Sequence, residues 1–422
     1  MDVIDIRDLV YYPVSDRKVM RGEGVHLYDE DGTEYLDCVA GTFNLSLGYS
    51  HPAVVAAMKH QLDLLVHASS SLQNEPVNGL VRRLVEVSPE SLTKVHPKVS
   101  GGSTANEGAI KMAQHATGRS EVISLFRSHH GQTMMMTSVS GNAARRAPHP
   151  SLFPGTLQVP DPYCFRCFYG QRRESCGLMC VDRIEDFLDH ASTGRAAAVI
   201  VEPISGSGGN IVPPDGYFQK LRAFCDERDI VLIFDEVQTG IGRTGRMFAA
   251  EHFGVEPDII TTAKGLGGSG AQIAAILTNE RLAGLPADEH VFTYGANLLA
   301  AAAANATLDI VRQPEFLAHV RATGEHIRGR LAELAKRHRA IVDVRGVGLM
   351  IGFELGRPDG TPDVELARHL ARTAMRHGLI MRSSRYGHGN VLKIRPPLII
   401  TTDEADLLCD RLEGLLRAEL NA

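Results

Sequence analysis

The first part of the chain alternates apolar and polar residues and then changes to a helical pattern. Residues 25–39 (VHLYDEDGTEYLDCV) alternate on either side of Asp31-Gly32, which is typical of a β-hairpin with a tight turn. After His51-Pro52, the run AVVAAMKHQLDLLV repeats its apolar residues at helical spacing. This part of the sequence therefore predicts a hairpin followed by a helix.

The middle of the chain, from about residue 60 to about residue 300, alternates short apolar runs with amphipathic segments. The runs include AAAVIV (196–201), IVLIF (230–234), DIITT (258–262) and AAILT (274–278). Such alternation predicts a doubly wound α/β sheet. Residues 140–180 are rich in Pro, Arg and Cys, and we interpret them as a long irregular excursion.

The last part of the chain, after about residue 310, is rich in helical patterns and ends in two strand patterns and a helix. We interpret it as a smaller α+β domain that packs with the N-terminal hairpin. The expected bounds are 1–60 for the N-terminal segment of the small domain, 61–309 for the large domain, and 310–422 for the C-terminal small domain.

Composition narrows the possible partners and compartment. Hydrophobic residues make up 44% and charged residues 22%, as in ordinary globular proteins, and the formal net charge is -6. This balance favours neither a nucleic acid nor a membrane surface as partner. The start MDVIDIRDLVYYP lacks the pattern of a signal peptide, so we expect a cytoplasmic protein with its seven cysteines mostly reduced.

Polar residues follow three of the apolar runs at the point where each run ends. Glu202 follows the first, Asp235 the second and Lys264 the third. Ligands of open α/β sheets bind at the carboxyl ends of the strands. A structural ion pair would explain any one of these residues, but the three together indicate a common site.

Two glycine-rich turns point to a phosphate near that site. Gly101, Gly102 and Ser103 stand between a predicted strand and a predicted helix, and residues 264–268 read KGLGG. Glycines allow the backbone to approach an anion, and a helix N-terminus offers free N–H groups to it. Such a turn by itself is usually a simple connection. Together with a lysine and an acid, it indicates a phosphorylated cofactor beside a reactive amine.

Several motifs, in order along the whole chain, resemble those of class III aminotransferases, which have the aspartate-aminotransferase fold. They are GGSTANEGAIK (101–111), EPISGSGG (202–209), DEVQTGIGRTG (235–245), TTAKGLGG (261–268) and TYGAN (293–297), with LGYSHP (47–52) and IRPPLIIT (394–401) towards the ends. The resemblance implies a fold-type-I α/β enzyme with a mixed seven-stranded sheet in the large domain. It also implies pyridoxal 5'-phosphate as the cofactor, bound by the large domain.

The resemblance also assigns roles to residues of this chain. Lys264 would carry the cofactor as a Schiff base and then move the Cα proton of the substrate. Asp235 would pair with the pyridinium nitrogen, and Gln238 would hydrogen-bond the phenolic oxygen. Gly102 and Ser103 would bind the phosphate.

Three further residues complete the expected cofactor site. His129 takes the place of an aromatic residue that stacks on the cofactor ring in many family members, and Glu202 would stabilise the network around Asp235. Thr293 would reach the cofactor phosphate of the neighbouring subunit, which implies a homodimer with shared active sites. We interpret His130, next to His129, as structural.

Two departures from the family pattern bear on the substrate. Many members that use glutamate as the amino donor carry a Glu in the loop after the Glu-Pro motif (here Glu202-Pro203) and an Arg just before the Pro-Pro-Leu sequence, and the two form an ion pair. Here these positions hold Ser207 and Lys393. Arg395 lies two residues further on. Residues two apart on a strand face the same side, so both Lys393 and Arg395 are candidate substrate-binding residues. A lysine binds an anion as a point charge and not as a bidentate fork.

Four cysteines in one short stretch allow two interpretations. Cys164, Cys167, Cys176 and Cys180 have the spacing of a zinc knuckle, but they could also be reduced thiols packed in an irregular loop. Nothing in the cofactor chemistry requires a metal, and we assign none.

The function expected from these observations is an aminotransferase that moves an amino group between an amine or amino acid and an oxo-acid or aldehyde. The alternatives on the same scaffold are an amino-acid epimerase, a decarboxylase similar to dialkylglycine decarboxylase, or a lyase. A cofactor-binding protein without turnover is disfavoured, because Lys264, Asp235 and Gln238 are all present.

Overall fold

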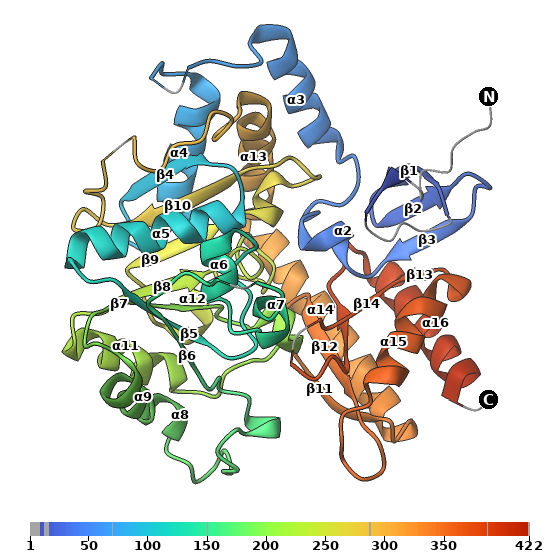
Figure 1. Cartoon of the computed structure of the whole chain (residues 1–422). Coiled ribbons are helices and arrows are strands. Elements are labelled where there is room, and N and C mark those ends of the chain that lie inside the picture. The colour runs from blue at the N-terminus through green and yellow to red at the C-terminus, as the bar shows by residue number, and fades with distance from the viewer. Residues whose placement is uncertain are drawn as a thin grey trace.

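The computed structural model of the protein describes residues 9–11, 17–69, 71–149, 151–286, 288–385 and 387–420. Its strands form one sheet of seven strands and two sheets of four. The seven-stranded sheet and its helices make up one part of the molecule, and the two smaller sheets lie beside it with the last helices of the chain (Figure 1).

The large sheet has the strand order β4-β10-β9-β8-β7-β5-β6. Its strands are β4 (Lys94–Val99), β5 (Glu121–Leu125), β6 (Thr156–Val159), β7 (Ala196–Val201), β8 (Val231–Asp235), β9 (Ile259–Thr262) and β10 (Ala274–Thr278). Strands β6, β5, β7, β8 and β9 run parallel, whereas β10 is antiparallel to both β4 and β9. The predicted mixed sheet is thereby confirmed, and the apolar runs found in the sequence form its central strands.

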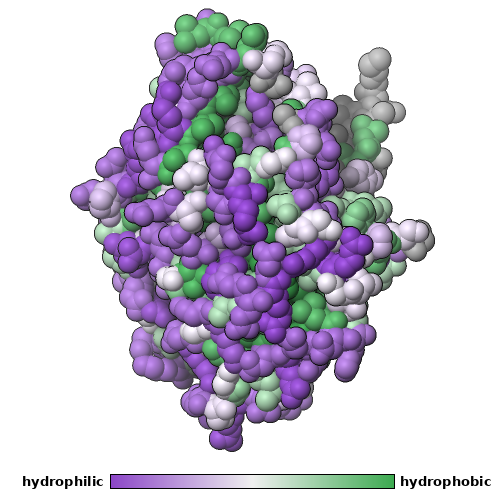
Figure 2. All heavy atoms as spheres, turned by 90° about the vertical axis from the view of Figure 1, so that its left-hand side faces the viewer, coloured by the Kyte–Doolittle hydropathy of each residue, from purple (hydrophilic) through white to green (hydrophobic). Residues whose placement is uncertain are grey.

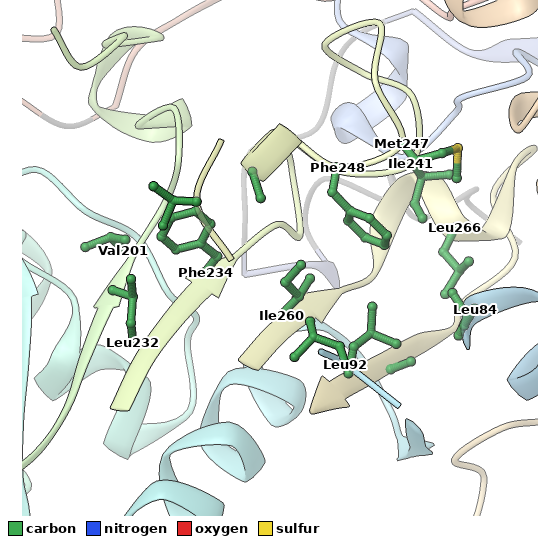
Figure 3. Close-up of a cluster of buried hydrophobic side chains, with 14 of the residues drawn as sticks. Leu84, Leu92, Val201, Leu232, Phe234, Ile241, Met247, Phe248, Ile260 and Leu266 are labelled. Carbon is green, nitrogen blue, oxygen red and sulfur yellow. The ribbon is translucent and has the colours of Figure 1, made fainter. Parts of the chain in front are cut away.

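The apolar runs are continuous because both faces of this sheet are buried. All residues of β7 are buried. In β8, Leu232 and Phe234 pack into one hydrophobic cluster, while Val231 and Ile233 pack into another on the opposite face. Figure 3 shows part of the first cluster, in which Phe234 and Leu232 lie beside Val201. A rigid, fully buried sheet fixes the positions of the residues at its strand ends.

The two smaller sheets join the N-terminal segment to the C-terminal part of the chain. One has the order β1-β2-β3-β13 and the other β11-β12-β15-β14. Their strands are β1 (Val19–Glu23), β2 (His26–Asp29), β3 (Glu34–Asp37), β11 (Ile341–Val347), β12 (Met350–Leu355), β13 (Leu379–Ile380), β14 (Arg382–Ser383) and β15 (Val391–Ile394). Strand β13 pairs in parallel with β3, and a shared hydrophobic cluster joins Val25 and Leu36 to Phe353 and Leu412. The exact domain bounds given above stay a prediction.

The helices connect these strands; many of them cover the large sheet, and the last helices of the chain lie with the smaller sheets (Figure 1). They are α2 (Ala40–Phe43), α3 (Pro52–Leu64), α4 (Glu75–Val87), α5 (Gly102–Thr117), α6 (Met134–Val139), α7 (Ala143–Arg146), α8 (Met179–Asp182), α9 (Ile184–Ala191), α10 (Gly206–Gly209), α11 (Tyr217–Glu227), α12 (Ala250–Phe253), α13 (Leu298–Val311), α14 (Pro314–Arg337), α15 (Val364–Thr373) and α16 (Thr402–Leu420). Short 3₁₀ turns are η1 (Cys164–Arg166), η2 (Lys264–Gly267) and η3 (Ala374–His377).

The segment 140–180 is more regular than the sequence indicates. It contains β6, an edge strand that pairs in parallel with β5, and the short helix α7. The four residues of β6 (TLQV) carry too little periodicity to predict a strand, and pairing with a central strand decides their conformation.

The surface is largely hydrophilic on the face shown in Figure 2, with hydrophobic side chains gathered at its top. Exposed hydrophobic residues lie on the end of α3 and the loop after it: Leu62, Leu64, Leu65, Val66 and Leu72. Within the described ranges, no helix combines the length and the apolar character needed to cross a membrane.

Candidate active site

A cavity of about 1000 Å³ opens at the carboxyl ends of the parallel strands and is closed on its other side by α15, β14 and β15. Most of the site residues expected from the sequence line it: Gly102, Ser103, His129, Glu202, Asp235, Gln238, Lys264 and Lys393. Thr293 and Arg395 are not among its lining residues. The strand-end reasoning thus predicted residues that share one cavity.

Lys264 lies at the centre of this arrangement, directly after β9. Its backbone has φ +40°, a left-handed conformation that is strained for a residue with a side chain. Burial lowers the pKa of its ammonium group, although Asp235 and Glu202 oppose this effect and Arg395 adds to it. The site therefore favours the neutral amine more than water does.

Asp235, the last residue of β8, is held by three hydrogen bonds. Its Oδ2 accepts from Asn106 Nδ2 (2.8 Å) and from His130 Nδ1 (2.8 Å), and its Oδ1 accepts from the backbone N–H of Val237 (3.1 Å). Asn106 in turn accepts a hydrogen bond from Thr261. These bonds stabilise the ionised carboxylate in a fixed orientation beside the cavity.

Sequence reasoning missed two of these residues. The sequence assigns no role to Asn106 and only a structural one to His130, and both contact Asp235 directly. The signal that could have found them is their position within the motifs around residues 101–111 and 128–133. Their partner is more than 100 residues away in the sequence, so no local pattern connects them with it.

Glu202 organises the wall next to Asp235. One of its oxygens accepts from the backbone N–H of His129 (2.9 Å) and the other from that of Gly206 (2.8 Å). Burial, followed by the electrostatic effects of Lys264, His130 and Arg145, lowers the pKa of the His129 ring to about 3, with Asp235 opposing. His129 is therefore an uncharged ring at the wall of the cavity.

The glycine turn and helix α5 form another wall. The hydroxyl of Thr104 accepts hydrogen bonds from the backbone N–H groups of Ser100 (3.0 Å) and Gly101 (3.1 Å). The first N–H groups of α5 itself have no partners within the helix and point away from it. A side chain at Gly102 would come within 2.8 Å of a methyl group of Val237, so this close approach favours glycine.

Gln238 and Arg395 form a pair in which only Gln238 lines the cavity. Arg395 is 1% exposed and donates to Gln238 Oε1 (2.5 Å) and to the carbonyl of Gly206 (2.7 Å). Strand β15 ends at Ile394, so the two-residue periodicity that relates Lys393 to Arg395 no longer applies. Lys393 lines the cavity together with Ser207, and this placement of Arg395 differs from our expectation.

Thr293 is exposed, on the segment before α13. All seven cysteines are free thiols, and Cys164, Cys167, Cys176 and Cys180 are half-buried. In the parts of the chain that the structure describes, no three His, Cys, Asp or Glu side chains are arranged to hold a metal ion.

Comparison with known proteins decides the family. The model of the family "Aminotransferase class-III" matches residues 11–416. The chain belongs to the class III aminotransferases. The acetylornithine aminotransferase of Methanothermobacter thermautotrophicus is 37% identical over 93% of this chain and 91% of the relative, and the alanine/serine racemase of Pyrococcus horikoshii is 35% identical over 95% and 85%. An amine transaminase from an uncultivated Pseudomonas species, solved with pyridoxal phosphate bound, superposes with a TM-score of 0.89 at 32% identity, covering 99% of this chain and 97% of that one.

The aminotransferase is a pyridoxal-phosphate-dependent enzyme, and the cavity suits this cofactor. A lysine amine, a carboxylate held by three donors and the N-terminus of α5 at Gly102, all lining the cavity, match the cofactor's carbonyl, ring nitrogen and phosphate. These groups all face the same cavity, which is large enough for a cofactor and a substrate together.

Proposed function

We propose that Lys264 and Asp235 are the catalytic residues of this aminotransferase. What supports this most is that a strained, half-buried lysine and a buried, hydrogen-bonded carboxylate face one cavity from the ends of adjacent parallel strands. Lys264 would hold pyridoxal phosphate, Asp235 would face its ring nitrogen, and Gln238 its phenolic oxygen. Gly102 and Ser103 would bind the phosphate, and His129 would stack on the ring.

The chemical step depends on proton movement by Lys264. Pyridoxal phosphate, when bound, supplies an electron-withdrawing ring that makes the Cα proton of an amino substrate acidic. Because burial lowers the pKa of Lys264, its Nζ is available as a neutral base that accepts this proton and later returns it. Asp235, which accepts hydrogen bonds from Asn106, His130 and the Val237 N–H, would stabilise positive charge on the cofactor's ring nitrogen.

Glu202 and Arg395 act as positioning residues in this proposal. Glu202 fixes the backbone at His129 and Gly206, and Arg395 fixes Gln238 from behind the cavity. Lys393 is a buried basic residue at the position where many family members have the arginine that binds a substrate carboxylate. We propose that it contacts the anionic end of the substrate.

We further propose a homodimer in a reducing compartment, the cytoplasm. Exposed Leu62, Leu64 and Leu65 lie at the end of α3, and the ring of His67, just beyond them, lies 5.6 Å from that of Tyr294. An apolar surface next to Thr293 would be covered by a second subunit, whose cofactor Thr293 would then reach. Seven free thiols without a disulfide are compatible with a reducing compartment.

The test is a single-donor experiment in D₂O. The holoenzyme is incubated with one amino donor at a time, without an oxo acceptor, and the products are quantified. An aminotransferase releases at most one oxo product per active site and resumes only when an oxo-acid or aldehyde is added. Continuous turnover without an acceptor would contradict amino transfer.

The alternative function with support of its own is amino-acid epimerisation, because the racemase of Pyrococcus horikoshii is about as similar as the aminotransferase relative. In the same experiment, an epimerase would continuously form the mirror-image amino acid with deuterium at Cα and no oxo product. A decarboxylase would release carbon dioxide, and a lyase would release a β-substituent.

A further inference from the structure

The outer part of the active-site cavity carries a group of arginines that the proposed cofactor chemistry does not use. They are Arg368 and Arg372 on α15, Arg382 on β14, and Arg385 just after it, and we call them the arginine rim. The cofactor phosphate is proposed to bind at α5, which covers the large sheet, whereas the rim belongs to the C-terminal part of the chain (Figure 1). Arg368, Arg372 and Arg385 are exposed, so this side of the cavity is open to solvent.

Within the described ranges, the rim and Lys393 have no anionic partner. Among the described residues, none of their side chains forms an ion pair or a hydrogen bond, whereas arginines outside the cavity such as Arg83 and Arg222 are paired with carboxylates. Glu365, the acid nearest in sequence on α15, lies 3.8 Å from Arg357 and is itself exposed. The cavity's other acids, Glu202 and Asp235, stand at the ends of strands β7 and β8 and accept the hydrogen bonds described above.

The positions of Arg382 and Lys393 are electrostatically unfavourable. Arg382 and Lys393 are directly opposite each other on the antiparallel strands β14 and β15, where like charges destabilise the pair. Lys393 is 4% exposed, and burial, followed by Arg395, Arg382 and Arg385, lowers its pKa. Asp37 attracts Arg382 only from a distance, because its carboxylate accepts from Tyr49 and from the N–H groups of Val39 and Gly41. An anion in the cavity would offset this repulsion.

A second, smaller cavity of about 400 Å³ adjoins the rim. It shares Arg145, Arg368, Arg385 and Ser383 with the main cavity, and His388 also lines it; none of the described residues that line it is acidic. Basic and hydroxyl groups thus continue outward from the active site. A single carboxylate needs only one arginine, but several guanidinium groups around one space match a phosphate, which has more charge and more acceptor oxygens.

We propose that the arginine rim binds a phosphate ester carried by the amino substrate at the end remote from its amino group. The amino group of this substrate lies at Lys264, so the inference rests on the proposed reaction and names its substrate class. Lys393 contacts the same anionic end from the inner side.

The first test is calorimetric titration of the cofactor-loaded enzyme with inorganic phosphate, since the cofactor then occupies the phosphate site at α5. The variant is the double substitution Arg368→Gln and Arg385→Gln, both exposed residues whose loss leaves the core intact. The matched control is Arg376→Gln, an exposed arginine in η3 that does not line the cavity. We expect phosphate affinity to fall roughly tenfold or more in the double variant, and to change less than about twofold in the control.

Each other outcome overturns the proposal. Phosphate that fails to bind, or that binds equally to parent and double variant, is not held by the rim. Glutarate is the comparison probe, and if only glutarate binds and depends on the rim, the remote group is a carboxylate.

The second test separates this inference from the proposed reaction. The donors O-phosphohomoserine and homoserine differ only in the phosphate, and the double variant should lose kcat/KM for the first alone. Equal losses for both donors would contradict phosphate recognition. If no donor reacts with the parent enzyme, the proposed function is wrong. The phosphate titration would still show whether the arginine rim binds phosphate.

Discussion

Replacing Asp235 by Asn tests the proposed role of the carboxylate with little change in shape. The oxygen of the new amide can still accept hydrogen bonds from Asn106 and His130, which lie 2.8 Å from Oδ2 of the aspartate. The amide NH₂ then faces the backbone N–H of Val237, which loses its 3.1 Å acceptor. The group that faces the cavity changes from an anion to a neutral amide.

The expected effects on stability and on catalysis differ in size. One hydrogen bond is lost in a buried place, which reduces the free energy of unfolding by about 1–3 kcal/mol. On the catalytic side, a hydrogen bond to a charged group contributes roughly 1.5–3 kcal/mol, so removal of the Cα proton should slow by about tenfold to a hundredfold. Loss of the charge attraction between residue 235 and the cofactor's ring nitrogen would slow this step further.

The assay is deuterium incorporation at Cα of an amino donor, followed by NMR, together with urea unfolding of the same protein. Glu236→Gln is the matched control, because Glu236 is the adjacent buried acid but does not line the cavity. Its carboxylate accepts from the N–H groups of Ala249 and Ala250 (both 2.8 Å). If Asp235→Asn and Glu236→Gln exchange the Cα proton at the same rate, the role assigned to Asp235 is wrong.

Three further predictions concern single groups. Lys264→Ala should abolish Cα exchange and leave the fold unchanged by circular dichroism, with partial recovery when a small primary amine is added; full activity without the amine would refute the assignment. Burial raises the pKa of Glu236 from 4.5 to about 7, so the folded protein holds this proton more tightly than the unfolded chain does. The free energy of unfolding should therefore fall by about 3 kcal/mol as the pH rises from 4.5 to 7, and a urea series should show this slope in the parent but not in Glu236→Gln. His129→Phe should keep the shape of the pH–rate profile, because the pKa of His129 is about 3 and its ring is uncharged above that value; a lost limb of the profile near neutral pH would show that His129 titrates there.

The sequence by itself determined the large sheet and the residues at its strand ends. Runs such as 196–201 and 274–278 coincide with β7 and β10, because strands buried on both faces are continuously apolar. Glu202, Asp235 and Lys264 were predicted to share one site from their positions alone, since neighbouring parallel strands end at the same edge of a sheet.

Only the tertiary structure decided how this site is completed. His130 and Asn106 contact Asp235 from elements distant in sequence, and Arg395 lies behind Gln238 because β15 ends one residue before it. The arginine rim likewise forms only when α15, β14 and β15 meet above the large sheet. Local patterns record which residues alternate or repeat, but contacts between distant segments depend on how packed elements lie in space, and no single stretch of sequence carries that information.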